Sequence, residues 1–139
     1  MIYADIYAKL AADPTITGAV STYLGAPAII TAPIALTDVE CPFVLIEQAS
    51  AGPGIASPRC LRSWTETLYV RVVDDRDQSA GTINTIAHAV HLALDRTNIS
   101  ETYGAGYGRG YLECTGAQYY LDADGFPGAI VTVTANLWI

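Results

Sequence analysis

Residues 61–73, LRSWTETLYVRVV, alternate between apolar and polar side chains and predict a half-buried β-strand. The apolar side carries Trp64, Leu68, Val70 and Val72, and the polar side carries Thr65, Thr67, Tyr69 and Arg71. Such alternation is typical of an antiparallel strand with one face on a core. Glu66 is the exception on the apolar side, and we expect it toward an exposed start of the strand.

A helix is predicted directly after this strand. The acidic run 74–77, DDRD, precedes it, and negative charge near a helix N-terminus offsets the helix dipole. Apolar residues then recur at helical spacing, namely Ile83, Ile86, Ala87, Val90 and Leu94. We expect the helix to end near residues 97–98, with Leu92 as an apolar candidate on its polar side.

The segment before the strand predicts a shorter helix and a second strand. Ile2, Ile6 and Leu10 recur every four residues, and Asp13-Pro14 should end this helix near residue 12 and start a short turn toward residue 20. Residues 25–41 contain two prolines and predict an extended connection with a short edge strand. Residues 43–50, FVLIEQAS, then predict a strand.

Two β-rich runs at the end of the chain flank an Asp-Gly turn. They cover residues 111–121 and 128–139, with DADG at 122–125 between them, and predict a hairpin. The order helix, strand, strand, helix, strand, strand predicts an α+β fold as one domain over residues 1–139. We expect an antiparallel or mixed sheet of four to five strands, two main helices packed on one face, and extended loops.

Composition narrows the function classes. Apolar residues make up 51% of the chain and charged residues 15%, which is globular composition with few charges and favours a surface partly covered by other subunits. The net charge of −7 argues against tight nucleic-acid binding. No signal peptide or membrane-spanning run is recognised, so we expect synthesis in the cytosol. Cys41, Cys60 and Cys114 form no C-x-x-C and predict free thiols.

Residues 102–111, TYGAGYGRGY, superficially resemble a phosphate-binding loop. The glycine spacing is G-x-G-x-G-x-G, and the loop follows a helix and precedes a strand, so it does not fit a dinucleotide fingerprint. A flexible or partner-ordered loop is the plainer interpretation. No nucleophile elbow or activated cysteine motif is present, and we expect neither an enzyme nor a cofactor.

The second predicted helix carries a candidate metal site. His88 and His91 share a helical face with Asn84 and Asp95, but the H-x-x-H spacing lacks the features of a zinc protease helix. DADG lacks the third acid and the glutamate of a calcium loop. A hairpin turn and a polar helix face are therefore expected, and a small metal- or ligand-binding module using His88, His91 and Asp95 stays as an alternative.

The ordered pattern along nearly the whole chain resembles the small tail-terminator or tail-completion proteins of long-tailed, siphovirus-like bacteriophages. Its most telling parts are Pro42-Phe43-Val44, the strand-to-helix junction Val72-Val73-Asp74-Asp75 and the closing acidic hairpin. The segments that carry the resemblance are IYADIYAKLAADPTITGAV, CPFVLIEQAS, WTETLYVRVVDDRD, QSAGTINTIAHAVHLALD and DADGFPGAIVTVTANLWI.

The resemblance implies a mixed sheet packed against helices and a structural role without catalytic residues. It implies a hexameric ring at the virion neck, assembled in the host cytoplasm, that caps the tail tube and ends its polymerisation. The implied partners are the tail tube protein and the head–tail connector or stopper, with no membrane and with DNA passing through unbound. A neck stopper or connector adaptor is the alternative within this class.

Contact residues are expected on loops, where arginine and tyrosine are frequent interface anchors. The candidates for subunit or partner contacts are Arg59, Arg62, Leu92, Tyr103, Tyr107, Arg109 and Tyr111. An acidic channel would repel passing DNA, and the candidates to line it are Asp74, Asp75, Asp77, Asp122 and Asp124.

Overall fold

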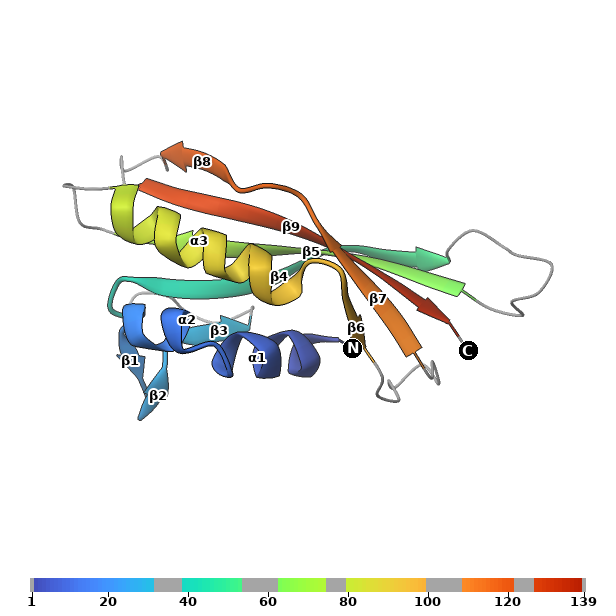
Figure 1. Ribbon diagram of the computed structural model, residues 1–139, viewed down its shortest axis with the longest axis horizontal. Coiled ribbons are helices and arrows are strands. Elements are labelled where there is room, and N and C mark those ends of the chain that lie inside the picture. The colour runs from blue at the N-terminus through green and yellow to red at the C-terminus, as the bar shows by residue number, and fades with distance from the viewer. Residues whose placement is uncertain are drawn as a thin grey trace.

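The fold is α+β, and a computed structural model describes residues 2–31, 39–53, 63–74, 80–99, 109–121 and 127–138 (Figure 1). The helices in these ranges are α1 (Tyr3–Ala11), α2 (Pro14–Ala19) and α3 (Ala80–Leu94). The strands are β1 (Thr22–Tyr23), β2 (Ala26–Pro27), β3 (Ile29–Thr31), β4 (Phe43–Pro53), β5 (Ser63–Val73), β6 (Thr97–Ile99), β7 (Arg109–Cys114), β8 (Gln118–Leu121) and β9 (Pro127–Trp138).

One mixed sheet of seven strands forms the centre of the molecule, in the order β3-β4-β5-β9-β7-β6, with β8 also paired to β9. Strand β3 runs parallel to β4, and the other neighbouring pairs are antiparallel. The predicted α+β class with a mixed sheet is confirmed. The expected count of four to five strands was too low, because the predicted strand at 111–121 is divided into β7 and β8 and because β6 adds a pairing on the far side of β7.

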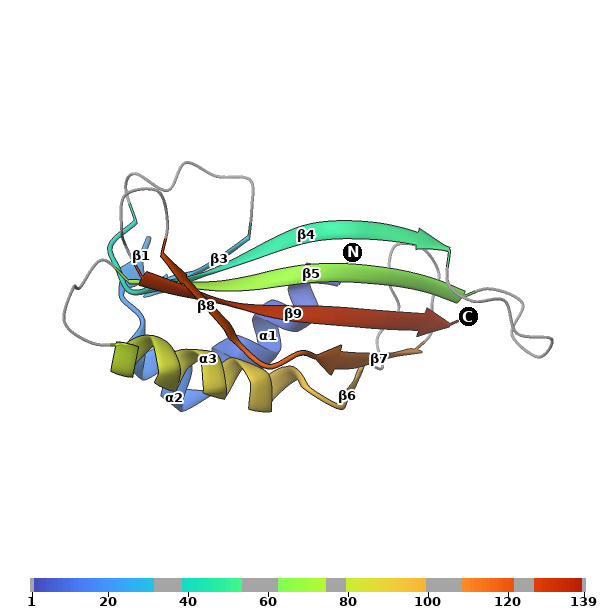
Figure 2. The same ribbon diagram turned by 90° about the horizontal axis from the view of Figure 1, so that it is seen from above.

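All three helices lie on one face of this sheet (Figure 2). Alternation places Leu68, Val70 and Val72 of β5 on that face, and all three are buried. They pack in one core with the apolar stripe of α3 and with alternate residues of β9. The apolar faces predicted for β5 and α3 therefore pack against each other as the two layers of the core.

The short helix α2 begins where the sequence predicts. Asp13 is its N-cap: Oδ1 accepts hydrogen bonds from the backbone N–H of Thr15 at 2.8 Å and of Ile16 at 3.3 Å. Pro14 occupies the first turn, where its missing N–H is not needed. Asp13 therefore separates α1 from α2, as the Asp-Pro step predicts.

Three local predictions were wrong. Helix α3 ends at Leu94 instead of near residues 97–98, because Thr97–Ile99 pairs with β7. Residues 111–121 are not one strand: β7 and β8 are separate, and both pair with β9. Glu66 is 8% exposed and not at an exposed start, because its side chain lies on the helix-facing side of β5 with Leu68, opposite the core residue Ala135 of β9.

The last glycine of the glycine and tyrosine loop has a packing role. Gly110 lies in β7, and a Cβ at this position would stand 2.5 Å from Cδ2 of Leu137 and 3.1 Å from the carbonyl oxygen of Asn136. Only glycine allows β7 and β9 to approach this closely without a shift of the neighbouring chain. The rest of the proposed flexible loop lies outside the described residues.

Candidate assembly surfaces

The solvent side of α3 is one candidate surface. Its exposed positions are Gly81, Asn84, Thr85, His88 and Leu92, which recur at helical spacing opposite the buried stripe. Leu92 is 64% exposed, which confirms the expected position of this side chain on the polar side of the helix. Residues 78–94 contain no Asp, Glu, Lys or Arg, so this helix face carries no formal charge while its two histidines are neutral.

A second surface is the hairpin of β1 and β2, which the sequence did not reveal. The strands pair antiparallel through Thr22 with Pro27 and Tyr23 with Ala26. Leu24 and Gly25 form the tip with φ values of 49° and 80°, the positive-φ pair that a type I′ hairpin turn requires. Leucine is unusual there, and Leu24 is 87% exposed.

The base of this hairpin is held firmly to the body. The backbone N–H of Ser21 donates to the carbonyl of Pro42 at 2.8 Å, and the carbonyl of Ala28 accepts from the backbone N–H of Val44 at 2.9 Å. Tyr23 packs against a small second core that includes Phe43 and Leu45. The hairpin therefore projects from a fixed base, which holds its tip in place.

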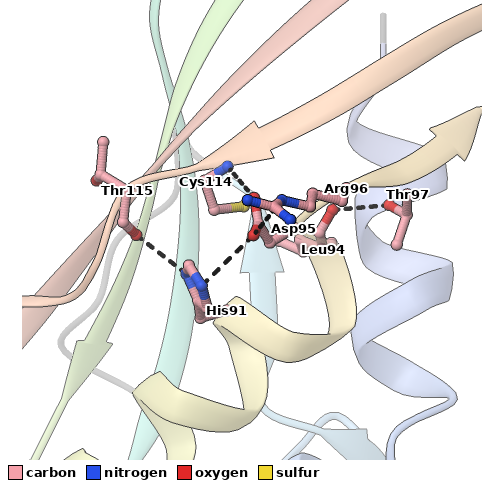
Figure 3. Close-up of polar contacts among 7 residues, drawn as sticks. All are labelled: His91, Leu94, Asp95, Arg96, Thr97, Cys114 and Thr115. Carbon is pink, nitrogen blue, oxygen red and sulfur yellow. Dashed lines mark hydrogen bonds and ion pairs between the residues drawn. The ribbon is translucent and has the colours of Figure 1, made fainter.

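A polar cluster fastens the C-terminal end of α3 to β7 (Figure 3). Asp95 Oδ1 accepts a hydrogen bond from the backbone N–H of Cys114 at 2.8 Å, and its Oδ2 lies 3.6 Å from Nε2 of His91. His91 Nδ1 is 3.2 Å from the carbonyl oxygen of Thr115. Burial first, and the charge of Asp95 second, raise the pKa of the Cys114 thiol to about 12. A thiol with this pKa is protonated and unreactive at neutral pH.

Beside this cluster lies an open hollow of about 280 Å³. It is lined by Asp95, Arg96, Tyr111, Glu113 and Cys114. Tyr111, a predicted contact residue, is thus half-buried and lines this hollow together with the largely exposed Arg96. Arg96 has a φ of 56°, in the left-handed conformation common just after a helix.

The other predicted contact residues are only partly placed. Arg109 begins β7, where its backbone pairs with that of Trp138, and its side chain is not described. Arg59, Arg62, Tyr103 and Tyr107 lie outside the described residues. Of the predicted contacts, the structure therefore places the side chains of Leu92 and Tyr111, on different surfaces.

The prediction that Asp74 lines a channel does not agree with its burial. Asp74 is 1% exposed, and its backbone N–H donates to the carbonyl of Pro127 at 3.4 Å. A carboxylate buried within a single chain cannot face a channel between chains. The other candidates, Asp75, Asp77, Asp122 and Asp124, lie outside the described residues.

The residues of the considered metal site are not all brought together. His91 contacts Asp95, whereas His88 is exposed on the solvent side of α3. In the part of the chain that the structure describes, no group of three His, Cys, Asp or Glu side chains gathers to hold a metal ion. Among the same residues, no helix combines the length and the apolar character needed to cross a bilayer.

Comparison with solved structures shows what fold this chain shares with a known protein. No protein-family model matches the sequence, and no curated protein matches it. Among solved structures, a chain in the virion of a native gene transfer agent particle is similar with a TM-score of 0.63 and 16% sequence identity. The match covers 96% of this chain and 92% of that chain. At this identity the comparison establishes a shared fold over nearly the full length of both chains.

Proposed function

We propose that this protein is a structural component of a phage-like virion, and that it acts as a tail terminator. The observation that carries the proposal is the shared fold with a chain of a gene transfer agent virion, over 96% of this chain. The sequence pattern points to the same class. In this role the protein forms a hexameric ring that caps the finished tail tube, ends its growth and joins the tail to the head connector.

The surface properties are consistent with this role. A ring of identical chains needs two different complementary patches on each chain. The hairpin tip and the uncharged face of α3 are two such patches, and each exposes a leucine, Leu24 and Leu92. The role needs no catalytic step, cofactor or membrane, and DNA passes through the ring without specific binding.

The other predicted site residues are assigned two roles, as contacts and as channel lining. Arg59, Arg62, Tyr103, Tyr107 and Arg109 are the candidate contacts to the neighbouring subunit, the tail tube protein or the connector. The acids proposed to line the channel are Asp75, Asp77, Asp122 and Asp124. Like charges repel DNA, which would keep the passing genome from binding the ring.

Particles assembled without this protein test the proposal. Negative-stain images should show abnormally long tails detached from heads, because nothing ends polymerisation of the tube, and supplying the protein in trans should restore tail length. Tails of normal length together with heads that lose DNA would instead indicate a neck stopper. Normal, joined particles would contradict both functions.

A further inference from the structure

The distribution of charge limits where two copies of this chain can touch. Each chain has a net charge of −7, so identical chains repel one another on average. Residues 14–37 and 78–94 contain no Asp, Glu, Lys or Arg. These stretches include the β1–β2 hairpin and α3, so the side chains of these two elements carry no Asp, Glu, Lys or Arg charge; the nearest charged residues are Glu40 at the hairpin base and Asp95 and Arg96 just after α3. A contact between these two surfaces would avoid the repulsion.

The hairpin tip has two unfavourable features in the isolated chain. Leu24 has a φ of 49°, in a region that leucine rarely adopts, and its side chain is 87% exposed. Asparagine or glycine would satisfy the turn without either feature. A strained residue held in place by a firm base suggests a role for its side chain. An apolar side chain at a projecting tip is suited to insertion against another apolar surface.

The face of α3 offers such a surface. Leu92 is 64% exposed, with Asn84, Thr85 and His88 on the same face toward the helix N-terminus and the largely exposed Arg96 just beyond the C-terminal end. Strand β8 adds Tyr119, which is 57% exposed. Tyr119 pairs with Ala129, whose side chain is in the helix-facing core, so Tyr119 lies on the same side of the sheet as α3.

The two surfaces lie on different sides of the molecule. The hairpin projects beyond β3 and α2, whereas α3 runs beneath β9 with β8 beyond it (Figure 1). The hairpin of one copy can therefore contact the α3 face of a second copy while its own α3 face receives a third. A head-to-tail contact of this kind generates a ring when the rotation between copies closes.

We propose that Leu24 of one copy packs against the α3 face around Leu92 of the next copy. This inference rests on the proposed ring function and names its subunit contact. The partner is a second copy of this chain, because charge neutrality on both surfaces is what an acidic chain needs for contact with itself. Tyr119 forms the border of the receiving surface on the β8 side.

The substitution Leu24→Asn tests the tip without harming the turn. Asparagine tolerates positive φ and is favoured before glycine in this turn, so the folded chain should keep or slightly raise its melting temperature. Self-association, measured by sedimentation velocity, should weaken at least about tenfold, as for an interface hot spot. Leu92→Gln should weaken it similarly, because glutamine is a good helix former and removes the apolar surface.

The matched control is Tyr7→Gln on α1, which alters an exposed apolar side chain outside both surfaces and should leave association unchanged. A direct measurement combines Leu24→Cys and Leu92→Cys in one chain. With Cys41 and Cys60 replaced by serine, the double variant should form ladders of linked chains under oxidation, while either single variant should not. Any of three results would overturn the proposal. Leu24→Asn could associate as strongly as the wild type, the ladder could be absent, or the wild-type protein could stay monomeric at its highest soluble concentration.

The two proposals fail in different ways. If particles without the protein have long tails but Leu24→Asn associates normally, the tail-terminator function stands and this contact is wrong. If the ladder forms and Leu24→Asn is monomeric, but particles without the protein have tails of normal length, the contact stands and the terminator function is wrong.

Discussion

At the scale of single residues, one carboxylate continues a strand ladder that the backbone leaves incomplete. Strand β6 begins at Thr97, which pairs with Leu112 of β7. The N–H of Cys114, two residues farther along β7, therefore has no residue of β6 opposite it. Asp95 Oδ1 accepts from that N–H at 2.8 Å. An acid directly after the C-terminal end of a helix is unfavourable for the helix dipole, so its presence here is explained by this hydrogen bond and by His91.

Replacing this carboxylate should show its contribution to stability. We expect Asp95→Ala to lower the free energy of unfolding by about 1 to 3 kcal/mol, because it leaves a part-buried N–H without its acceptor. Asp95→Asn keeps an oxygen for that N–H and should cost clearly less. Urea unfolding of both variants gives the comparison, and amide exchange at Cys114 should accelerate only in the alanine variant. Equal stability of wild type and Asp95→Ala would contradict this role of Asp95.

Residue identity also explains what sequence reasoning missed. Leu24 and Arg96 both have positive φ, yet neither is glycine or asparagine, the residue types that signal such turns. The hairpin and the early end of α3 were therefore not recognised. Asp74 was expected to be exposed because it belongs to an acidic run, but its position directly after β5 carries it into the interior.

At the scale of elements, long regular segments could be predicted and short ones could not. Strands β5 and β9 and the core face of α3 follow from alternation or helical spacing over many residues, and β4 follows from its run of β-branched and aromatic residues. Strand β6 has three residues and exists because β7 lies beside it, and β7 and β8 are divided by how each pairs with β9. Pairings between distant segments leave no periodic signal within a short strand.

The close approach of β7 and β9 is an element-level feature that one glycine makes possible. We expect Gly110→Ala to lower the free energy of unfolding by about 1 to 3 kcal/mol, because the new methyl group would overlap the buried Leu137 and press on the backbone of β9. Gly116→Ala is the matched control, since a Cβ there meets nothing within 4 Å, and it should be nearly neutral. Thermal unfolding of the two variants measures the difference. A Gly110→Ala protein as stable as Gly116→Ala would show that the two strands can separate at little cost.

At the scale of the whole molecule, the net charge opposes self-association, whereas the exposed apolar side chains favour it. The chain carries −7 in total, yet the exposed leucines lie on segments without formal charge. The net charge, and the place of Leu92 on the polar side of α3, could both be predicted from the sequence. The sequence could not show that Leu24 is exposed at a hairpin tip, because this depends on backbone geometry and on the anchoring of its base by residues 40–42.

This opposition predicts how self-association depends on salt. Raising sodium chloride from about 0.05 M to about 0.5 M shortens the range of charge repulsion from above 10 Å to a few ångströms, and leaves apolar contacts intact. We therefore expect sedimentation velocity to show stronger self-association of the wild-type protein at the higher salt concentration, with Leu24→Asn remaining weak at both. If salt instead dissolves the assemblies, opposite charges hold the subunits together. Arg59 and Arg62 would then become the first candidates for the contact, in place of the uncharged face of α3.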